Sequence, residues 1–170
     1  MVIVHTGLGK GKTTAALGMV MRAWGHGMRI GVIQFIKSPE VTTGEARAAR
    51  SMEVDWTATG DGFTWEGGDL AASRDQALRG WELAQDKVTS GDYDVLILDE
   101  FAHPLSFGWI DPVEVVEWLQ AHRPAPLHVI ITGAVAPPEL VDYADLVTEM
   151  RLVKHPYADR GVPAQRGIEF

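Results

Sequence analysis

One short stretch near the start of the chain restricts its fold more than any other. Residues 7–14 read GLGKGKTT; they follow an apolar run at residues 2–4 and open a helical pattern. Glycines between a strand and a helix let backbone N–H groups turn around an anion, and the helix start adds the positive end of a dipole. In such a loop Lys12 can reach a phosphate, and the hydroxyl of Thr13 can ligate Mg²⁺. The stretch therefore predicts a phosphate-binding loop after a first strand.

This loop is a variant of the general pattern, which has a glycine, four residues and then Gly-Lys-Ser/Thr. The Gly-Lys-Thr at residues 11–13 fits, but the first glycine of the pattern would fall on Thr6. Lys10 adds a second cation. The alternative is an ordinary glycine-rich turn. The preceding strand, the Gly-Lys-Thr and the following helix together favour the phosphate-binding loop.

A second segment, residues 93–100, reads YDVLILDE and ends in two carboxylates. Strands of a parallel sheet that is covered on both faces form such continuous apolar runs, and ligands of open α/β sheets lie beyond the carboxyl ends of the strands. Asp99 and Glu100 are therefore expected near Thr13, where they could hold Mg²⁺ directly or through water. Without the loop, the same residues would indicate a solvated acidic turn.

Strand and helix patterns alternate along the chain. The expected strands are residues 2–4, 29–36, 52–56, 94–98, 127–131 and 146–153, and the expected helices are residues 13–24, 43–51, 70–88, 111–121 and 138–143. This alternation predicts an α/β fold with a doubly wound, mostly parallel sheet and helices on both faces. Since 170 residues suffice for one well-packed domain, we expect a single domain over residues 1–170.

The composition excludes several classes of protein. The absence of cysteine excludes disulfides and thiolate metal sites, and the absence of asparagine excludes the Asn-Lys-x-Asp signature of GTPases. A net charge of −8 argues against a nucleic-acid partner, because the phosphate backbone requires a basic patch. No apolar run approaches the roughly 20 residues of a membrane span, and the N-terminus lacks a signal-peptide pattern. We therefore expect no membrane partner and a cytoplasmic location.

Three further features allow two interpretations each. Phe63 and Trp65 lie in a glycine-bounded loop, where they either pack on the core or form a flat apolar wall for a planar ligand. His103 follows the two carboxylates closely and either touches a ligand or is incidental. The tail at residues 154–170 has no period, and it is either an ordinary terminus or a segment that folds over a bound anion.

The chain resembles the P-loop ATP:corrinoid adenosyltransferases of the CobA/CobO/BtuR type. The matching segments are residues 6–16, 31–37, 62–66, 98–100, 130–133, 153–157 and 164–169, in the order in which the family has them. The variant loop, which fits the general pattern poorly, fits this family well. The resemblance implies a P-loop NTPase-like (RecA-like) fold.

The resemblance also implies a reaction: the 5′-deoxyadenosyl group of ATP is transferred to the cobalt of cob(I)alamin or another reduced corrinoid, and triphosphate is released. It implies ATP binding by the loop and by one arginine of the first helix: Gly7, Leu8, Gly9, Lys10, Gly11, Lys12, Thr13, Thr14 and Arg22. It places Mg²⁺ or Mn²⁺ on Thr13, Glu100 and Asp99 and gives catalytic roles to Lys12 and Glu100.

By the same resemblance, Phe63 and Trp65 line the corrinoid side, the protein is a homodimer, and an external reductase of flavin or flavodoxin type supplies the reduced corrinoid. Two features depart from the family. Relatives usually carry a segment ahead of the first strand, and many have arginine at the position of Ala134. Two other functions stay open: a small P-loop kinase or ATPase that cleaves the γ-phosphate, and a non-catalytic nucleotide- or corrinoid-binding protein.

Overall fold

The computed structural model describes residues 1–36, 43–60 and 70–169, and these residues build one six-stranded sheet. The strands are β1 (Val2–Thr6), β2 (Ile30–Gln34), β3 (Asp55–Ala58), β4 (Val95–Asp99), β5 (His128–Thr132) and β6 (Leu146–Glu149). They lie in the order β3-β2-β4-β5-β1-β6, and every neighbouring pair is parallel. All carboxyl ends of the strands therefore meet at one edge of the sheet.

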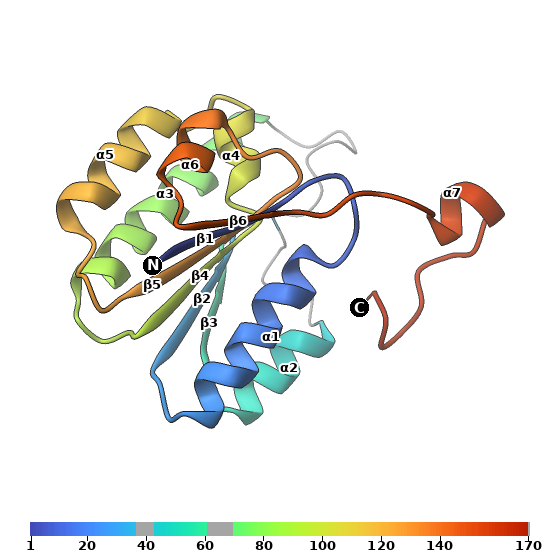
Figure 1. The fold of residues 1–170 in the computed structure, drawn as a ribbon, viewed down its shortest axis with the longest axis horizontal. Helices are drawn as coiled ribbons and strands as arrows, with labels where there is room; N and C mark the ends of the chain where they lie inside the picture. The colour runs from blue at the N-terminus through green and yellow to red at the C-terminus, as the bar shows by residue number, and fades with distance from the viewer. Residues whose placement is uncertain (37–42, 61–69, 170) are drawn as a thin grey trace.

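Helices cover both faces of this sheet (Figure 1). The helices that cover the sheet are α1 (Lys12–Gly25), α2 (Gly44–Ser51), α3 (Leu70–Thr89), α4 (Ala102–Ser106), α5 (Pro112–His122) and α6 (Pro138–Tyr143). A further helix, α7 (Pro156–Arg160), lies away from the sheet. Helices α1 and α2 lie on one face, and α3, α4, α5 and α6 lie on the other. The predicted α/β class, with a parallel sheet between two helical layers, is confirmed.

Two hydrophobic cores result from the alternation of side chains along each strand. Val2 and Val4 of β1 face the core under α3 and α5, whereas Ile3 faces the core under α1 and α2. Strand β4 divides in the same way, with Leu96 and Leu98 on the first side and its other apolar residues on the second. Because both faces of the central strands are buried, their sequences are continuous apolar runs.

The end of β6 and the start of β3 differ from the predicted bounds, because pairing with the neighbouring strand sets them. β6 ends at Glu149, not at residue 153, because its partner β1 ends at Thr6, which pairs with Glu149. β3 begins at Asp55, because residues 52–53 complete the turn after α2 and Asp55 pairs with Gly31 of β2. The short helices α4 and α7 were not predicted.

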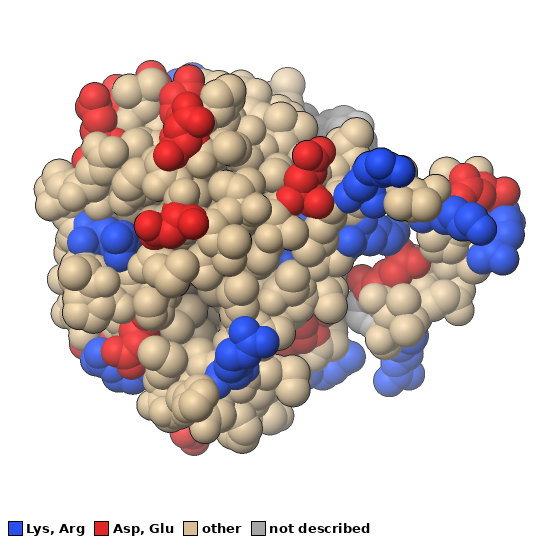
Figure 2. All heavy atoms as spheres, in the orientation of Figure 1, with Lys and Arg blue, Asp and Glu red and all other residues tan. Residues whose placement is uncertain are grey.

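Residues 150–169, here called the arm, leave the sheet after β6 (Figure 1). The arm runs outward to α7, and its end returns to the loop before α1, where Glu169 forms an ion pair with Lys10. Figure 2 shows Lys and Arg side chains along the arm and at its root, and the arm contains four basic and two acidic residues. In the described part of the chain, no helix has the length and apolar character needed to cross a bilayer.

Candidate functional site

The loop at residues 7–11 follows the carboxyl end of β1, between the ends of β5 and β6. Its glycines are required by close backbone approach. A Cβ atom on Gly7 would lie 2.5 Å from the carbonyl oxygen of Met150, and one on Gly9 would lie 2.6 Å from it. Gly7 and Gly11 also have φ values of 99° and 103°, which glycine adopts without strain. The chain after β6 therefore fixes the shape of the loop.

Lys12 opens α1, and its ammonium group folds back onto the loop. Its Nζ donates to the carbonyl oxygens of Gly7 and Gly9, at 2.8 Å each. In the described residues no side chain caps the N-terminus of α1, and its first turn contains no acidic residue. The first N–H groups of a helix have no partner within the helix and carry positive partial charge. The loop, Lys12 and the helix start therefore form one electropositive corner.

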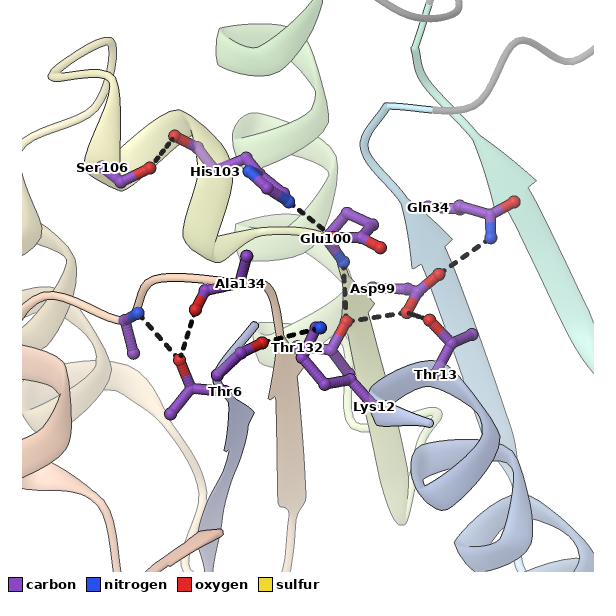
Figure 3. A network of polar contacts seen from close by, with 12 residues as sticks. Thr6, Lys12, Thr13, Gln34, Asp99, Glu100, His103, Ser106, Thr132 and Ala134 are labelled. Atoms are coloured by element: carbon purple, nitrogen blue, oxygen red, sulfur yellow. Dashed lines mark hydrogen bonds and ion pairs between the residues drawn. The ribbon is translucent and has the colours of Figure 1, made fainter. Parts of the chain in front are cut away.

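Asp99, at the end of β4, connects three strands and the first turn of α1 (Figure 3). Its Oδ1 accepts hydrogen bonds from the hydroxyls of Thr13 and Thr132, at 2.9 and 2.7 Å. Its Oδ2 accepts from Nε2 of Gln34 at 2.8 Å. Burial, with a contribution from the charge of Glu100, raises the pKa of Asp99, although the three hydrogen bonds oppose the rise. Asp99 holds Thr13 in place, and only 1% of Asp99 is exposed.

Glu100 turns the chain out of the sheet. Its φ of 63° lies in the left-handed region, which is unusual for a residue with a side chain. Its N–H donates to Oγ1 of Thr132 at 2.9 Å. Its carboxylate lies against the ring of His103, with 2.9 Å between Oε2 and Nε2. Glu100 is more accessible than Asp99, since 24% of its side chain is exposed.

The structure brings Lys12, Thr13, Asp99 and Glu100 together, as the sequence predicts. Leu8 and Thr14 lie on the exposed side of the loop and the helix. Arg22 lies on the last turn of α1, about 15 Å along the helix from Lys12 at 1.5 Å per residue. The structure therefore does not bring Arg22 to the loop, and its predicted contact with the nucleotide stays a prediction.

The remaining predicted site residues are Lys10, which lies in the loop, and the aromatic pair Phe63 and Trp65. The ammonium group of Lys10 pairs with Glu169 of the arm. The tail thus reaches the loop, as one of its two interpretations requires. Phe63 and Trp65 lie outside the described residues.

Sequence reasoning missed Gln34 and Thr132 as parts of this site. Both end apolar strands, and β2 and β5 flank β4 in the sheet. Gln34 pairs in register with Asp99. A polar residue at the carboxyl end of a buried strand is a signal for such a position, but the sequence does not reveal which strands are neighbours.

The site fits a divalent cation that is shared with a ligand. Thr13 and Glu100 offer hard oxygen donors, the type that Mg²⁺ prefers. The described residues contain no group of three or more His, Cys, Asp or Glu side chains that could hold a metal ion. Mg²⁺ usually takes one or two protein ligands together with substrate phosphates and water, so these few donors suit it.

A parallel sheet with helices on both faces, a glycine-rich loop between β1 and α1, and two acids at the end of β4 define a P-loop nucleotide-binding protein. The sequence model of one family, described as ATP:corrinoid adenosyltransferase BtuR/CobO/CobP, matches residues 1–170. The chain belongs to this family.

Curated relatives agree with this assignment over the whole chain. A protein named corrinoid adenosyltransferase from Pseudomonas aeruginosa is 43% identical over 171 residues, which cover 100% of this chain and 83% of that one. A protein of the same name from Sinorhizobium sp is 41% identical and covers 100% of this chain and 80% of its own length. Corrinoid adenosyltransferase CobA of Salmonella typhimurium is 38% identical, with 100% and 85% covered.

Proposed function

We propose that residues 1–170 form a single domain that transfers the 5′-deoxyadenosyl group of ATP to the cobalt of a reduced corrinoid. The electron pair of Co(I) forms the bond to C5′, the C5′–O5′ bond breaks, and its electrons leave with inorganic triphosphate. The observation that carries the proposal is the convergence of Lys12, Thr13 and Glu100 at the loop of a chain that belongs to this family. No proton has to be transferred in this step, so the site needs no general base.

The electropositive corner supports the departure of triphosphate. Negative charge develops on the leaving oxygen, and preorganised donors stabilise charge where it develops. Lys12 would exchange its two carbonyl partners, Gly7 and Gly9, for phosphate oxygens. Lys10 would exchange Glu169 in the same way. The first exchange replaces neutral acceptors by charged ones, and the second replaces one anionic partner by another.

Mg²⁺, or Mn²⁺ in its place, belongs to the proposal as a partner of the phosphates. The hydroxyl of Thr13 and the carboxylate of Glu100 would hold it, and Asp99 would orient Thr13 through the hydrogen bond of 2.9 Å. When bound, the cation neutralises charge on the triphosphate. The raised pKa and deep burial of Asp99 support an orienting role for this residue.

Other parts of the proposal are predictions that come from the sequence or from the family. Phe63 and Trp65 would form an apolar wall on the corrinoid side of the site and exclude water from the cobalt. An external flavin or flavodoxin-type reductase and a cytoplasmic location stay predictions. A homodimer has additional support from the arm, which exposes four apolar side chains: Leu152, Val153, Tyr157 and Ile168.

The identity of the products tests the proposed reaction. The protein is mixed with ATP, Mg²⁺ and chemically reduced cob(I)alamin in a single turnover. We expect a light-sensitive cobalt–carbon bond and one triphosphate for each corrinoid alkylated. Accumulation of ADP while the cobalt stays unalkylated would contradict the proposal and would indicate a kinase or ATPase. Binding of both substrates without any product would indicate a carrier.

A paired substitution tests the corrinoid side. Phe63→Ala with Trp65→Ala should slow the reaction that starts from cob(II)alamin and a reductant more than the reaction that starts from cob(I)alamin. The reason is that an apolar wall keeps other ligands off the cobalt and so eases its reduction. Equal losses from the two starting states would contradict a role of the wall in reduction.

A further inference from the structure

The contact between His103 and Glu100 is not part of the proposed reaction. His103 lies in the first turn of α4, and its ring points to the carboxylate of Glu100 (Figure 3). The distance between Nε2 of His103 and Oε2 of Glu100 is 2.9 Å. The backbone N–H of His103 also donates to the carbonyl oxygen of Glu100 at 3.1 Å. Two contacts therefore tie the same pair of residues together.

The backbone of Glu100 is fixed from a second side. Its N–H donates to Thr132 at the end of β5. A left-handed residue with a side chain persists only where the surroundings impose its conformation, and such residues concentrate at functional sites. The direction in which the Glu100 side chain leaves the backbone is thus set by β5 and by the first turn of α4.

The ring of His103 is itself well supported. Only 18% of its side chain is exposed. It lies beside the ring of Phe107, with 5.9 Å between the ring centroids, and it borders a narrow pocket together with Pro104. The neighbouring residues Ala102 and Leu105 anchor α4 in the core. A ring held in this way can hold the carboxylate that it touches.

We propose that His103 is a positioning residue for the divalent cation: by engaging Oε2 of Glu100, it restricts the carboxylate to one rotamer and leaves Oε1 for the cation. The inference rests on the proposed function, because it requires that Glu100 ligates the cation of the ATP complex. Carboxylates that ligate metals are commonly hydrogen-bonded by a further residue, and loss of that residue costs roughly 10- to 100-fold in metal affinity.

The test measures metal affinity without any corrinoid. Mn²⁺ binding to the complex of the protein with ATP is followed by the electron paramagnetic resonance signal of the remaining aqueous Mn²⁺. We expect His103→Ala to weaken Mn²⁺ binding about tenfold. ATP affinity in EDTA should stay unchanged, because the contact of His103 with Glu100 acts on the cation and not on the phosphates. His103→Gln keeps an N–H donor on a side chain of similar reach, so it should restore most of the affinity.

Ser106→Ala is the matched control, since Ser106 lies on the same helix and its hydroxyl donates to the backbone oxygen of His103, not to the ring. This variant should bind Mn²⁺ as the parent protein does. Two results would overturn the inference alone: parent-like Mn²⁺ affinity in His103→Ala, or an equal loss of ATP affinity in EDTA, which would mean that His103 only supports the fold. A parent protein that binds no Mn²⁺ with ATP would overturn the proposed function as well.

Discussion

At the scale of single residues, the glycines of the loop show how one missing side chain determines a site. Gly9 donates its N–H to the carbonyl oxygen of Met150 at 2.7 Å, and the two backbones touch. Lys12 depends on this arrangement, because one of the carbonyl oxygens that it binds belongs to Gly9. The lack of a side chain at Gly9 is therefore needed both for the packing of the loop and for the position of the Lys12 ammonium group.

Gly9→Ala should destabilise the protein and weaken ATP binding together. The added Cβ would lie 2.6 Å from a backbone oxygen, so the loop or the chain after β6 must move, at a cost of about 1–3 kcal/mol. Gly18→Ala is the matched control in the interior of α1, where the added Cβ meets no atom within 4 Å. It should raise the free energy of unfolding by about 0.5–1 kcal/mol. Urea unfolding measures the stability of each variant, and nucleotide titration measures its ATP affinity. A Gly9→Ala variant with unchanged stability and unchanged ATP affinity would contradict the steric argument.

Lys12→Ala should weaken ATP binding by about 10- to 100-fold, because a hydrogen bond to a charged group contributes roughly 1.5–3 kcal/mol. Lys10→Ala should have a smaller effect, because about half of the Lys10 side chain is exposed (51%) and solvent screens its charge. Calorimetric titration at low and high salt compares the two variants. Equal losses at both salt concentrations would mean that the two cations are equivalent.

At the scale of secondary-structure elements, a polar cluster at the amino ends of β3 and β4, opposite the candidate site, anchors the edge strand β3. Asp55 of β3 accepts hydrogen bonds from Lys87 of α3 and from the hydroxyl of Tyr93, which precedes β4. Burial alone would raise the pKa of Asp55, but the two hydrogen bonds and the charge of Lys87 hold it below the usual value. Burial and the bond to Asp55 raise the pKa of Tyr93.

Asp55→Asn should lower the free energy of unfolding at pH 7 by about 1–2 kcal/mol, because Lys87 would keep a buried ammonium group while solvent at Asp55 screens the pair. A lowered carboxyl pKa in the folded state stabilises it above the unfolded pKa of about 3.9, and this contribution is lost as the pH falls through the folded value. The difference between parent and variant should therefore shrink below about pH 4. Urea unfolding at pH 7 and pH 3.5 measures it; a constant difference would contradict the assignment.

Elements with their own local signals could be predicted from the sequence. Asp111 followed by Pro112 predicts a helix start, and the structure has Asp111 as the N-cap of α5, accepting from the N–H of Val113 at 2.8 Å. The ends of β3 and β6 could not be predicted, because the length of the neighbouring strand sets them. Helix α4 was missed since its five residues are too few for a periodic pattern.

The candidate site likewise contains residues that local motifs predict and residues that only the strand order brings in. Lys12, Thr13 and Glu100 belong to motifs that are continuous in the sequence, so their types and order predict their meeting at one edge of the sheet. Thr132 joins them only because β5 lies beside β4, and Met150 only because β6 lies beside β1. Those contacts depend on the strand order, which local sequence patterns do not encode.

At the scale of the whole molecule, the arm combines exposed apolar side chains with an excess of positive charge, while the chain as a whole carries −8. Val153→Asp with Tyr157→Asp should therefore convert the proposed dimer to a monomer. Both side chains are exposed in the single chain, so the fold should be retained. Light scattering coupled to size-exclusion chromatography measures the mass. A parent protein that is already monomeric would contradict the dimer, and an unchanged dimer would exclude these two side chains from its interface.

The place of β1 in the sheet has a consequence for how the protein is made. This strand is synthesised before the other five, yet both of its neighbours, β5 and β6, belong to residues 128–149. Most of the chain must be synthesised before β1 can form a single ladder of hydrogen bonds, and contacts so distant in sequence are slow to form. The nucleotide-binding loop, which follows the first strand of the sheet to be synthesised, is thus among the last parts of this domain to acquire its shape.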